Sequence, residues 1–302
     1  MKKLFLPTLT LVASAFVFTN CGGNDDQLVA KKDTVDTIAQ QAKPDISAEV
    51  INDIIQSIPS PLEMASMLKD GGQSYDVTLL NPTTNVDKYN TNYKMAFNVG
   101  VYSADLGYIN IYEKTFSAME YLNSVRKLSD GIKVGQFFDF ETLKRLATNN
   151  KNYDSLIFIS TENFNKMDAH LRTQNRSELS VLMISGAWLE GLNIACQVAK
   201  VKPSKDLIEK IGFEKINLDN ILLILNAYKN DKYFAQIVTE FERLKDIYGK
   251  INITYEYKEP ETKEVNGQLV IVNNSKSTVN INDEQLAEII GEIARVRGVM
   301  IN

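Results

Sequence analysis

The sequence predicts a mainly α-helical protein: an irregular antiparallel helical bundle with a small C-terminal β element and a final amphipathic helix. Two observations carry this prediction. Between Asp45 and Gly249, apolar residues recur at intervals of three and four, which is the period of a helix. After Gly249, residues 251–258 alternate between apolar and polar side chains, as they do in a half-buried strand.

Capping and stop residues set the expected helix boundaries. Ser47 can cap a first helix that Pro59 ends, and Ser60-Pro61 starts a short helix that ends at Gly71-Gly72. Further helices are expected at 86–113, 115–131, 137–146, 154–171, 177–199, 204–212, 218–229 and 231–248. The residues expected to open or cap five of them are Thr115, Asp154, Ser177, Ser204 and Asp231. Short loops between such helices favour antiparallel neighbours.

The C-terminal segment contains the β element and the last helix. Asn266-Gly267 is a hairpin turn signal before the apolar run that begins at Leu269. Asn282 and Gln285 form a capping-box pattern, which predicts a helix that ends at Gly298. This helix can dock on the bundle or reach a partner, and docking is the preferred interpretation.

Composition excludes several classes of function. The formal net charge is -5 and the basic residues are scattered, whereas a nucleic-acid partner requires clustered Lys and Arg. The two cysteines, Cys21 and Cys196, and the single histidine, His170, have no metal-ligand or disulfide-scaffold spacing. We therefore expect no metal and no cofactor. Cys196 is expected to be a core thiol, and His170 is expected at the surface.

The N-terminus has the features of an export signal. A basic segment, Met1-Lys2-Lys3, precedes an apolar stretch from Leu4 to Thr19, which is too short to span a membrane comfortably. Cys21 follows at once. This arrangement resembles the signal peptides of bacterial (Gram-negative) lipoproteins, in which this cysteine is diacylated and becomes the mature N-terminus. The body resembles uncharacterised helical envelope lipoproteins of no named family.

The resemblance implies a signal peptide at 1–20 and an address for the protein. Composition and apolar spacing divide the rest of the chain into a flexible tether at 21–44, a helical domain at 45–250 and a β-hairpin-like segment plus helix at 251–302. The protein would be lipid-anchored in the outer membrane and face the periplasm or the cell surface. Alternatively, cleavage after Ala15 would secrete the chain from Phe16 on and leave Cys21 free to pair with Cys196.

The tether carries two three-residue motifs. Asp33-Thr34-Val35 and Asp36-Thr37-Ile38 resemble O-glycosylation sites of some bacterial exported proteins, which makes Thr34 and Thr37 candidate modification sites.

Asp105 and Glu190 are the candidate catalytic residues. Each lies in an apolar helix beside glycine and other small residues, and paired carboxylates in an apolar cleft can perform acid–base chemistry. In the competing interpretation, the glycines only let two helices approach, and the acids face solvent or pair with Arg126 or Lys114.

Three functions remain open from the sequence. The leading hypothesis is a non-enzymatic, membrane-anchored binding or assembly module with an envelope protein or a glycan as partner. The alternatives are an envelope enzyme that uses Asp105 and Glu190, and a small-ligand carrier. In the carrier, Trp188 and the aromatic residues of 89–112 would line an apolar pocket.

Overall fold

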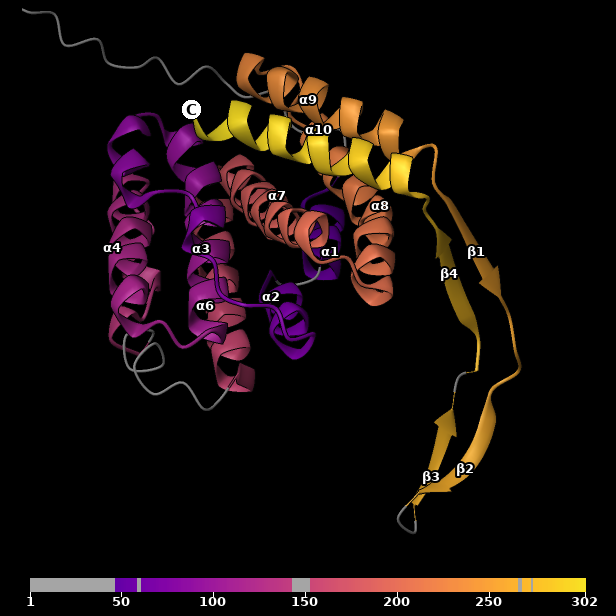
Figure 1. Ribbon diagram of the computed structural model, residues 1–302. Helices are drawn as coiled ribbons and strands as arrows, with labels where there is room; N and C mark the ends of the chain where they lie inside the picture. Colours follow the sequence, from indigo (N-terminus) through magenta and orange to yellow (C-terminus); the bar gives the residue numbers. More distant parts are fainter. Residues whose placement is uncertain (1–46, 59–60, 143–152, 266–267, 273) are drawn as a thin grey trace, which may run out of the picture. The chain divides into compact units, whose positions relative to one another are not determined.

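The computed structural model describes residues 47–58, 61–142, 153–265, 268–272 and 274–302, which belong to one compact unit. It confirms the mainly α-helical fold with a small C-terminal β element and a final helix (Figure 1). The helices are α1 (Ala48–Ser57), α2 (Pro61–Asp70), α3 (Asn92–Ile111), α4 (Thr115–Gly131), α6 (Tyr153–Thr173), α7 (Ser177–Val201), α8 (Lys205–Asn226), α9 (Lys232–Tyr248) and α10 (Asp283–Ile301). Short 3₁₀ turns occupy Val77–Leu79, Thr83–Lys88 and Gly135–Phe137.

The centre of the bundle is the pair α3 and α7, around which the other helices pack. Among the residues that the structure describes, α7 is the helix whose length and apolar composition would suffice to cross a membrane. The rest of the protein buries 94% of the most apolar 18-residue stretch of α7. Its apolar composition is therefore explained by its place in the protein core.

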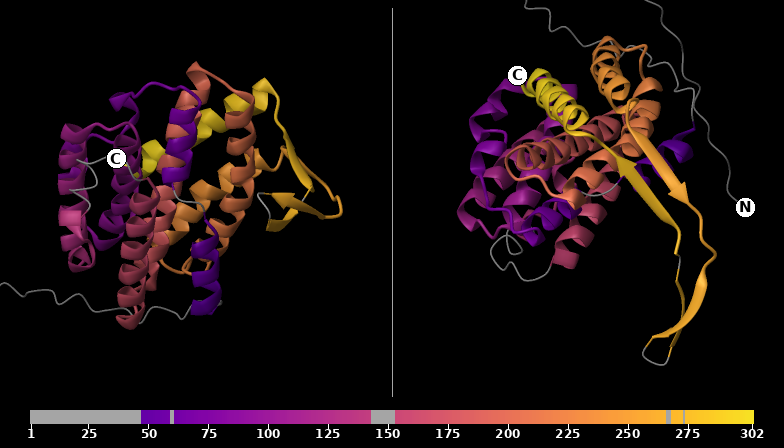
Figure 2. Two further views of the ribbon diagram at one scale, coloured as in Figure 1. Left: turned by 90° about the horizontal axis from the view of Figure 1, so that it is seen from below. Right: turned by 45° about the vertical axis from the view of Figure 1, so that its right-hand side comes forward.

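The C-terminal segment leaves the bundle as a β ribbon and returns to it as a helix. β1 (Asn252–Glu256) pairs antiparallel with β4 (Lys276–Asn280), and β2 (Glu261–Val265) pairs antiparallel with β3 (Gln268–Val272). α10 then packs along α9 and across α7 (Figure 2), which confirms that the final helix docks on the bundle. The predicted turn at Asn266-Gly267 lies outside the described residues.

Several predicted helix ends are confirmed by their capping bonds. Ser47, Ser204 and Asp231 each accept a hydrogen bond from a backbone N–H in the first turn of the next helix. The capping box of Asn282 and Gln285 is present in full. These polar side chains fix where each helix begins, because they accept hydrogen bonds from first-turn N–H groups that have no partner within the helix.

Other predicted helix ends are wrong by a few residues. α3 begins at Asn92 and not near 86, because Thr91 caps it through the Lys94 N–H and a 3₁₀ turn precedes it. Thr115 and Asp154 lie inside the first turns of α4 and α6 rather than at their caps. α10 continues past Gly298 to Ile301. The helix expected at 137–146 begins at 140 after a cap by Asp139, and the rest of it lies outside the described residues.

Among the predicted helix boundaries, the one at Gly212 differs most from the structure. The sequence predicts that a helix ends there and that another begins at 218, whereas α8 runs without a break from Lys205 to Asn226. Gly212 is buried, and a Cβ on it would lie 2.4 Å from Val279 Cγ1. The glycine therefore makes room for the base of β4 instead of ending the helix.

The strand prediction needs a smaller correction. Residues 252–256 form β1 as expected, but only Ile253 is half-buried and its neighbours on the strand are exposed. β4 had no clear sequence signal. Its Val279 is buried opposite Ile253, so the base of the ribbon packs against α8.

Candidate functional site

The site begins at a close contact between two helices. A Cβ on Gly100 would lie 1.9 Å from the Met183 carbonyl oxygen, and a Cβ on Gly186 would lie 2.0 Å from the Phe97 carbonyl oxygen. Such distances are shorter than any van der Waals contact, so only glycine lets α3 and α7 approach this closely. One to two turns further along, α3 contributes Asp105 and α7 contributes Glu190 to a shared interior site.

Both carboxylates are fully buried, with an exposed fraction of 0%. Arg297 of α10 forms two hydrogen bonds to Glu190: its Nε donates to Oε2 at 2.6 Å and its Nη2 donates to Oε1 at 2.5 Å. Nη2 also donates to the Leu79 carbonyl oxygen at 3.3 Å. A buried charge of this kind is tolerated only when it is paired with good geometry, and the fork of the guanidinium provides that geometry.

Asp105 differs from Glu190 in its partners. Its Oδ2 accepts a hydrogen bond from the Asn81 backbone N–H at 3.2 Å, whereas no neighbouring group donates to its Oδ1. Burial, together with the negative charge of Glu190, raises the pKa of Asp105 well above its ordinary value of 3.8. Asp105 therefore holds its proton more tightly than an exposed aspartate does. With Asp105 protonated, the three side chains have no net charge.

Polar contacts from the 79–89 segment and the C-terminus close the site. Asn81 Nδ2 donates to the Tyr89 hydroxyl at 3.0 Å, and that hydroxyl donates to the Ile301 carbonyl oxygen at 3.0 Å. The Tyr102 hydroxyl donates to the Pro82 carbonyl oxygen at 2.9 Å. These contacts tie the 79–89 segment to α3 and to the C-terminal end of α10.

The structure brings the predicted acid pair together but gives it different partners. The glycines do let the two helices approach. The alternative partners are occupied elsewhere: Arg126 lies 3.9 Å from Asp130, and the Lys114 Nζ lies over the Tyr75 ring at 5.5 Å. The acids do not face solvent either. The interpretation of surface acids is therefore wrong, and the pair is a buried one.

Sequence reasoning missed Arg297, although a signal for it exists. The apolar stripe of the last helix runs through Ile289 and Ile293, and Arg297 is four residues further along the same stripe. An arginine on a buried helix face needs an acidic partner, because an unpaired buried charge is strongly unfavourable. The two acids in apolar helices were the available partners.

Other predicted residues lie apart from this site. Trp188 packs against Phe241, and its Nε1 donates to Glu214 Oε2 at 2.7 Å. Cys196 is fully buried, as expected for a core thiol, and burial raises its pKa. His170 is half-buried against the Phe137 ring.

Neither Trp188 nor the tyrosines of 89–112 line the cavity of about 470 Å³ that lies beside α1, α2 and α6. Tyr89, Tyr102 and Tyr108 are instead buried in the core. Within the described part of the chain, no group of three or more His, Cys, Asp or Glu side chains is arranged to hold a metal ion. Cys21, Thr34 and Thr37 lie outside the described residues.

Comparison with known proteins adds no assignment. The chain matches no protein-family model, no curated protein and no solved structure. Its function must therefore be argued from its own residues.

Proposed function

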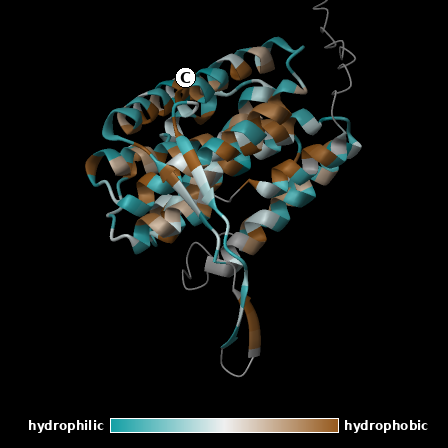
Figure 3. Cartoon of the chain, turned by 90° about the vertical axis from the view of Figure 1, so that its right-hand side faces the viewer, coloured by the Kyte–Doolittle hydropathy of each residue, from teal (hydrophilic) through white to brown (hydrophobic). Residues whose placement is uncertain are grey.

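We propose that the protein is a non-enzymatic binding module of the cell envelope. Lipid on Cys21 would hold it at the outer membrane, facing the periplasm or the cell surface, and its β ribbon would contact a partner protein. The observation that carries the proposal is the outer part of the ribbon, where β2 and β3 pair only with each other among the described strands. Figure 3 shows a hydrophobic β3 beside a hydrophilic β2.

The outer ribbon exposes apolar side chains that no helix covers. Leu269 and Ile271 are 77% and 78% exposed, and Val270 between them is 37% exposed. An isolated two-stranded hairpin is marginally stable in water, and exposing large aliphatic side chains on it adds nothing to its stability. A surface of this kind gains stability when another chain covers it.

The two edges of the ribbon differ in charge. The edge formed by β1 and β2 has five charged residues between 258 and 264: Lys258, Glu259, Glu261, Lys263 and Glu264. The opposite edge has none between 268 and 275. Charged side chains are the usual protection of an edge strand against pairing with another chain. Strand addition is therefore directed to the β3 edge.

The partner that suits this edge is an extended protein segment with few charges. Its backbone would continue the β2–β3 sheet, and its apolar side chains would cover Leu269 and Ile271. A glycan does not suit the β3 edge as well, because sugar hydroxyls would be left facing aliphatic side chains without hydrogen-bond partners.

The acid pair supports this proposal over the enzymatic alternative. Glu190 is held by two hydrogen bonds from Arg297, and both acids have an exposed fraction of 0%. A general acid or base must come within hydrogen-bond reach of its substrate. The geometry of this pair fits a role in holding α3, α7 and α10 together.

Two lysine substitutions at register partners test the proposal. Ile271 and Thr262 lie opposite each other on the ribbon, and both are exposed. A photo-crosslinking residue at position 270 of the lipidated chain is expected to form one discrete adduct in native membranes. Ile271→Lys should reduce this adduct at least tenfold because it puts a charge on the β3 edge. Thr262→Lys, which adds the same charge to the already charged edge, should leave the adduct unchanged.

The same experiment can reject the proposal. An equal loss of adduct in both variants would show that the edges do not differ. An adduct with twice the mass of the chain would identify a second copy rather than a different partner. Removal of the lipid by Cys21→Ser should weaken the adduct only by reducing the local concentration.

A further inference from the structure

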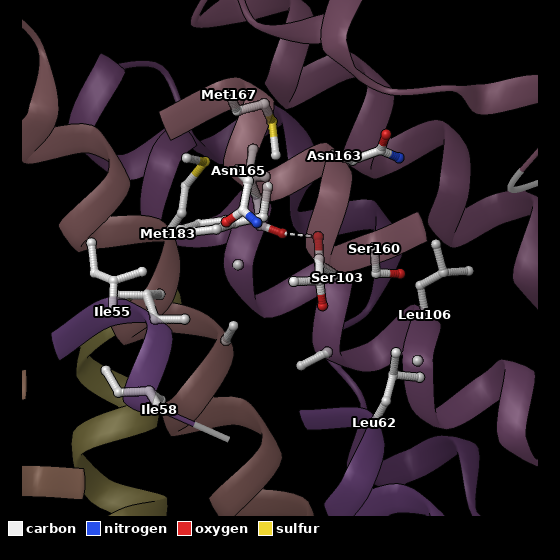
Figure 4. Close-up of a pocket in the computed structure, with 18 of the residues that line it drawn as sticks. Ile55, Ile58, Leu62, Ser103, Leu106, Ser160, Asn163, Asn165, Met167 and Met183 are labelled. Carbon is white, nitrogen blue, oxygen red and sulfur yellow. Dashed lines mark hydrogen bonds between the residues drawn. The ribbon is translucent and has the colours of Figure 1, made fainter. Parts of the chain in front are cut away.

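A separate cavity of about 470 Å³ lies among α1, α2, α3, α4, α6 and α7. Figure 4 shows its lining: Ile55 and Ile58 come from the α1 end, Leu62 from α2, Ser103 and Leu106 from α3, Met167 from α6 and Met183 from α7. Gly100, Ala104 and Ala187 also line it, and their small size leaves the space open. This volume and this mainly apolar lining are typical of pockets that hold a small molecule.

Two buried amides in the lining each have one atom without a hydrogen-bond partner. Asn110 is 5% exposed and no group donates to its Oδ1, while Asn163 is 4% exposed and its Nδ2 donates to no acceptor. Buried polar atoms in folded proteins are almost always paired, so each such exception needs an explanation. Here one amide needs a donor and the other needs an acceptor, and a single ligand can supply both.

The charge of the lining restricts the ligand further. Glu63 is the only ionisable side chain among the lining residues, and it is exposed. No Lys, Arg or His is present to pair with an anionic head group. An ionised group inside the cavity would lose its hydration without a counter-charge, so the ligand must be uncharged.

A polar contact at the edge of the cavity joins the two helices beside it. Gln56 Nε2 of α1 donates to Asn165 Oδ1 of α6 at 2.7 Å, and both side chains are exposed. Exposed hydrogen bonds of this kind contribute little stability and can open for a ligand.

We propose that this cavity binds an uncharged amphiphile. Its apolar chain would lie against the isoleucine, leucine and methionine side chains, and its polar group would donate to Asn110 and accept from Asn163. A primary amide and an alcohol both meet this requirement. The site shares no residue with the β ribbon and does not depend on the function proposed above.

Calorimetric titration of the purified full chain tests the site with four decyl probes. Decanamide and decanol are expected to bind with one-to-one stoichiometry. Decanoate and decylammonium, which have the same chain length but are charged, should bind at least tenfold more weakly. Ser103→Leu puts a larger side chain into the cavity and removes only a hydrogen bond to Val99 of its own helix, so it should abolish decanamide binding.

A matched pair of asparagines provides the control. Asn98 is also buried in α3 with an unpartnered Oδ1, but it does not line the cavity. Asn110→Ala should weaken decanamide binding about tenfold, whereas Asn98→Ala should leave it unchanged. These two variants decide the question even if Ser103→Leu fails to fold. Absence of decanamide binding to the unaltered chain, equal binding of decanoate, or equal effects of the two asparagine variants would overturn the proposal.

Discussion

At the scale of single residues, Arg297 is the side chain on which the buried acid pair depends. Replacing it with methionine keeps most of the apolar stem but leaves Glu190 buried without a counter-charge. We expect Arg297→Met to lower the free energy of unfolding by about 3–5 kcal/mol, as measured by urea denaturation at pH 7.

Arg295 of the same helix is the matched control. It pairs with Glu240 and Glu292, but its side chain is 36% exposed, so solvent screens the attraction. Arg295→Met should therefore lower the free energy of unfolding by only about 1 kcal/mol or less. Equal losses in the two variants would show that burial of the Glu190–Arg297 pair has no special energetic weight.

The raised pKa of Asp105 makes stability depend on pH. Because burial, assisted by the charge of Glu190, raises the pKa of this carboxyl above 3.8, the folded chain binds the proton more tightly than the unfolded chain. The stabilisation is complete below about pH 4 and is lost as the pH rises through the folded-state pKa, with a slope of up to about 1.4 kcal/mol per pH unit.

Asp105→Asn isolates this effect because the amide stays neutral at every pH. We expect the free energy of unfolding of the variant, relative to the unaltered chain, to increase between pH 4 and pH 8. Denaturant titrations of both proteins across this range measure the difference. A difference that stays constant with pH would mean that Asp105 is ionised in the folded state.

At the scale of helices, the contact between α3 and α7 depends on glycine. A Cβ at Gly100 would overlap the backbone of α7, so Gly100→Ala must push the two helices apart. We expect a loss of about 3 kcal/mol or more in thermal or urea unfolding, above the usual cost of overpacking because backbone rather than a flexible side chain is in the way.

Gly291 in α10 gives the opposite expectation for the same substitution. It is exposed, and nothing lies within 4 Å of a Cβ built on it. Gly291→Ala should therefore stabilise the protein by about 0.5–1 kcal/mol through helix propensity alone. If both alanine variants lost similar stability, the close approach of α3 and α7 would not be the cause.

The helices themselves could be predicted from the sequence because their signals are local. Capping at Ser47, Asp231 and Asn282 requires only neighbouring residues, and the apolar period of three and four extends over whole helices. The boundary at Gly212 could not be predicted, because the strand that packs against this glycine lies about 65 residues further along the chain. Local patterns do not show such contacts.

The same distinction applies to the candidate sites. The glycines beside Asp105 and Glu190 indicated the helix contact that brings the acids together. The cavity had no such signal, since its lining comes from six helices, and only the packed structure shows that Asn110 and Asn163 share it. The lining also differs from the predicted pocket, because neither Trp188 nor the aromatic residues of 89–112 contribute to it.

At the scale of the whole molecule, membrane attachment depends on Cys21. Each buried CH₂ of an acyl chain contributes about 0.8 kcal/mol, so a diacylated cysteine should hold the chain on a membrane through the tether that follows it, residues 22–44. Cys21→Ser should move the protein from the membrane fraction to the soluble fraction. Cys196→Ser, which alters a buried core thiol, should leave it in the membrane fraction.

Mass spectrometry of the mature chain separates the two export routes. A diacylated chain that starts at Cys21 carries the added mass of the lipid, whereas cleavage after Ala15 gives an unmodified chain that starts at Phe16. A soluble chain of the second kind would have only the β ribbon and the cavity to define its partners. The lipid would restrict those partners to a membrane surface, where a weak strand addition at β3 becomes effective through the high local concentration.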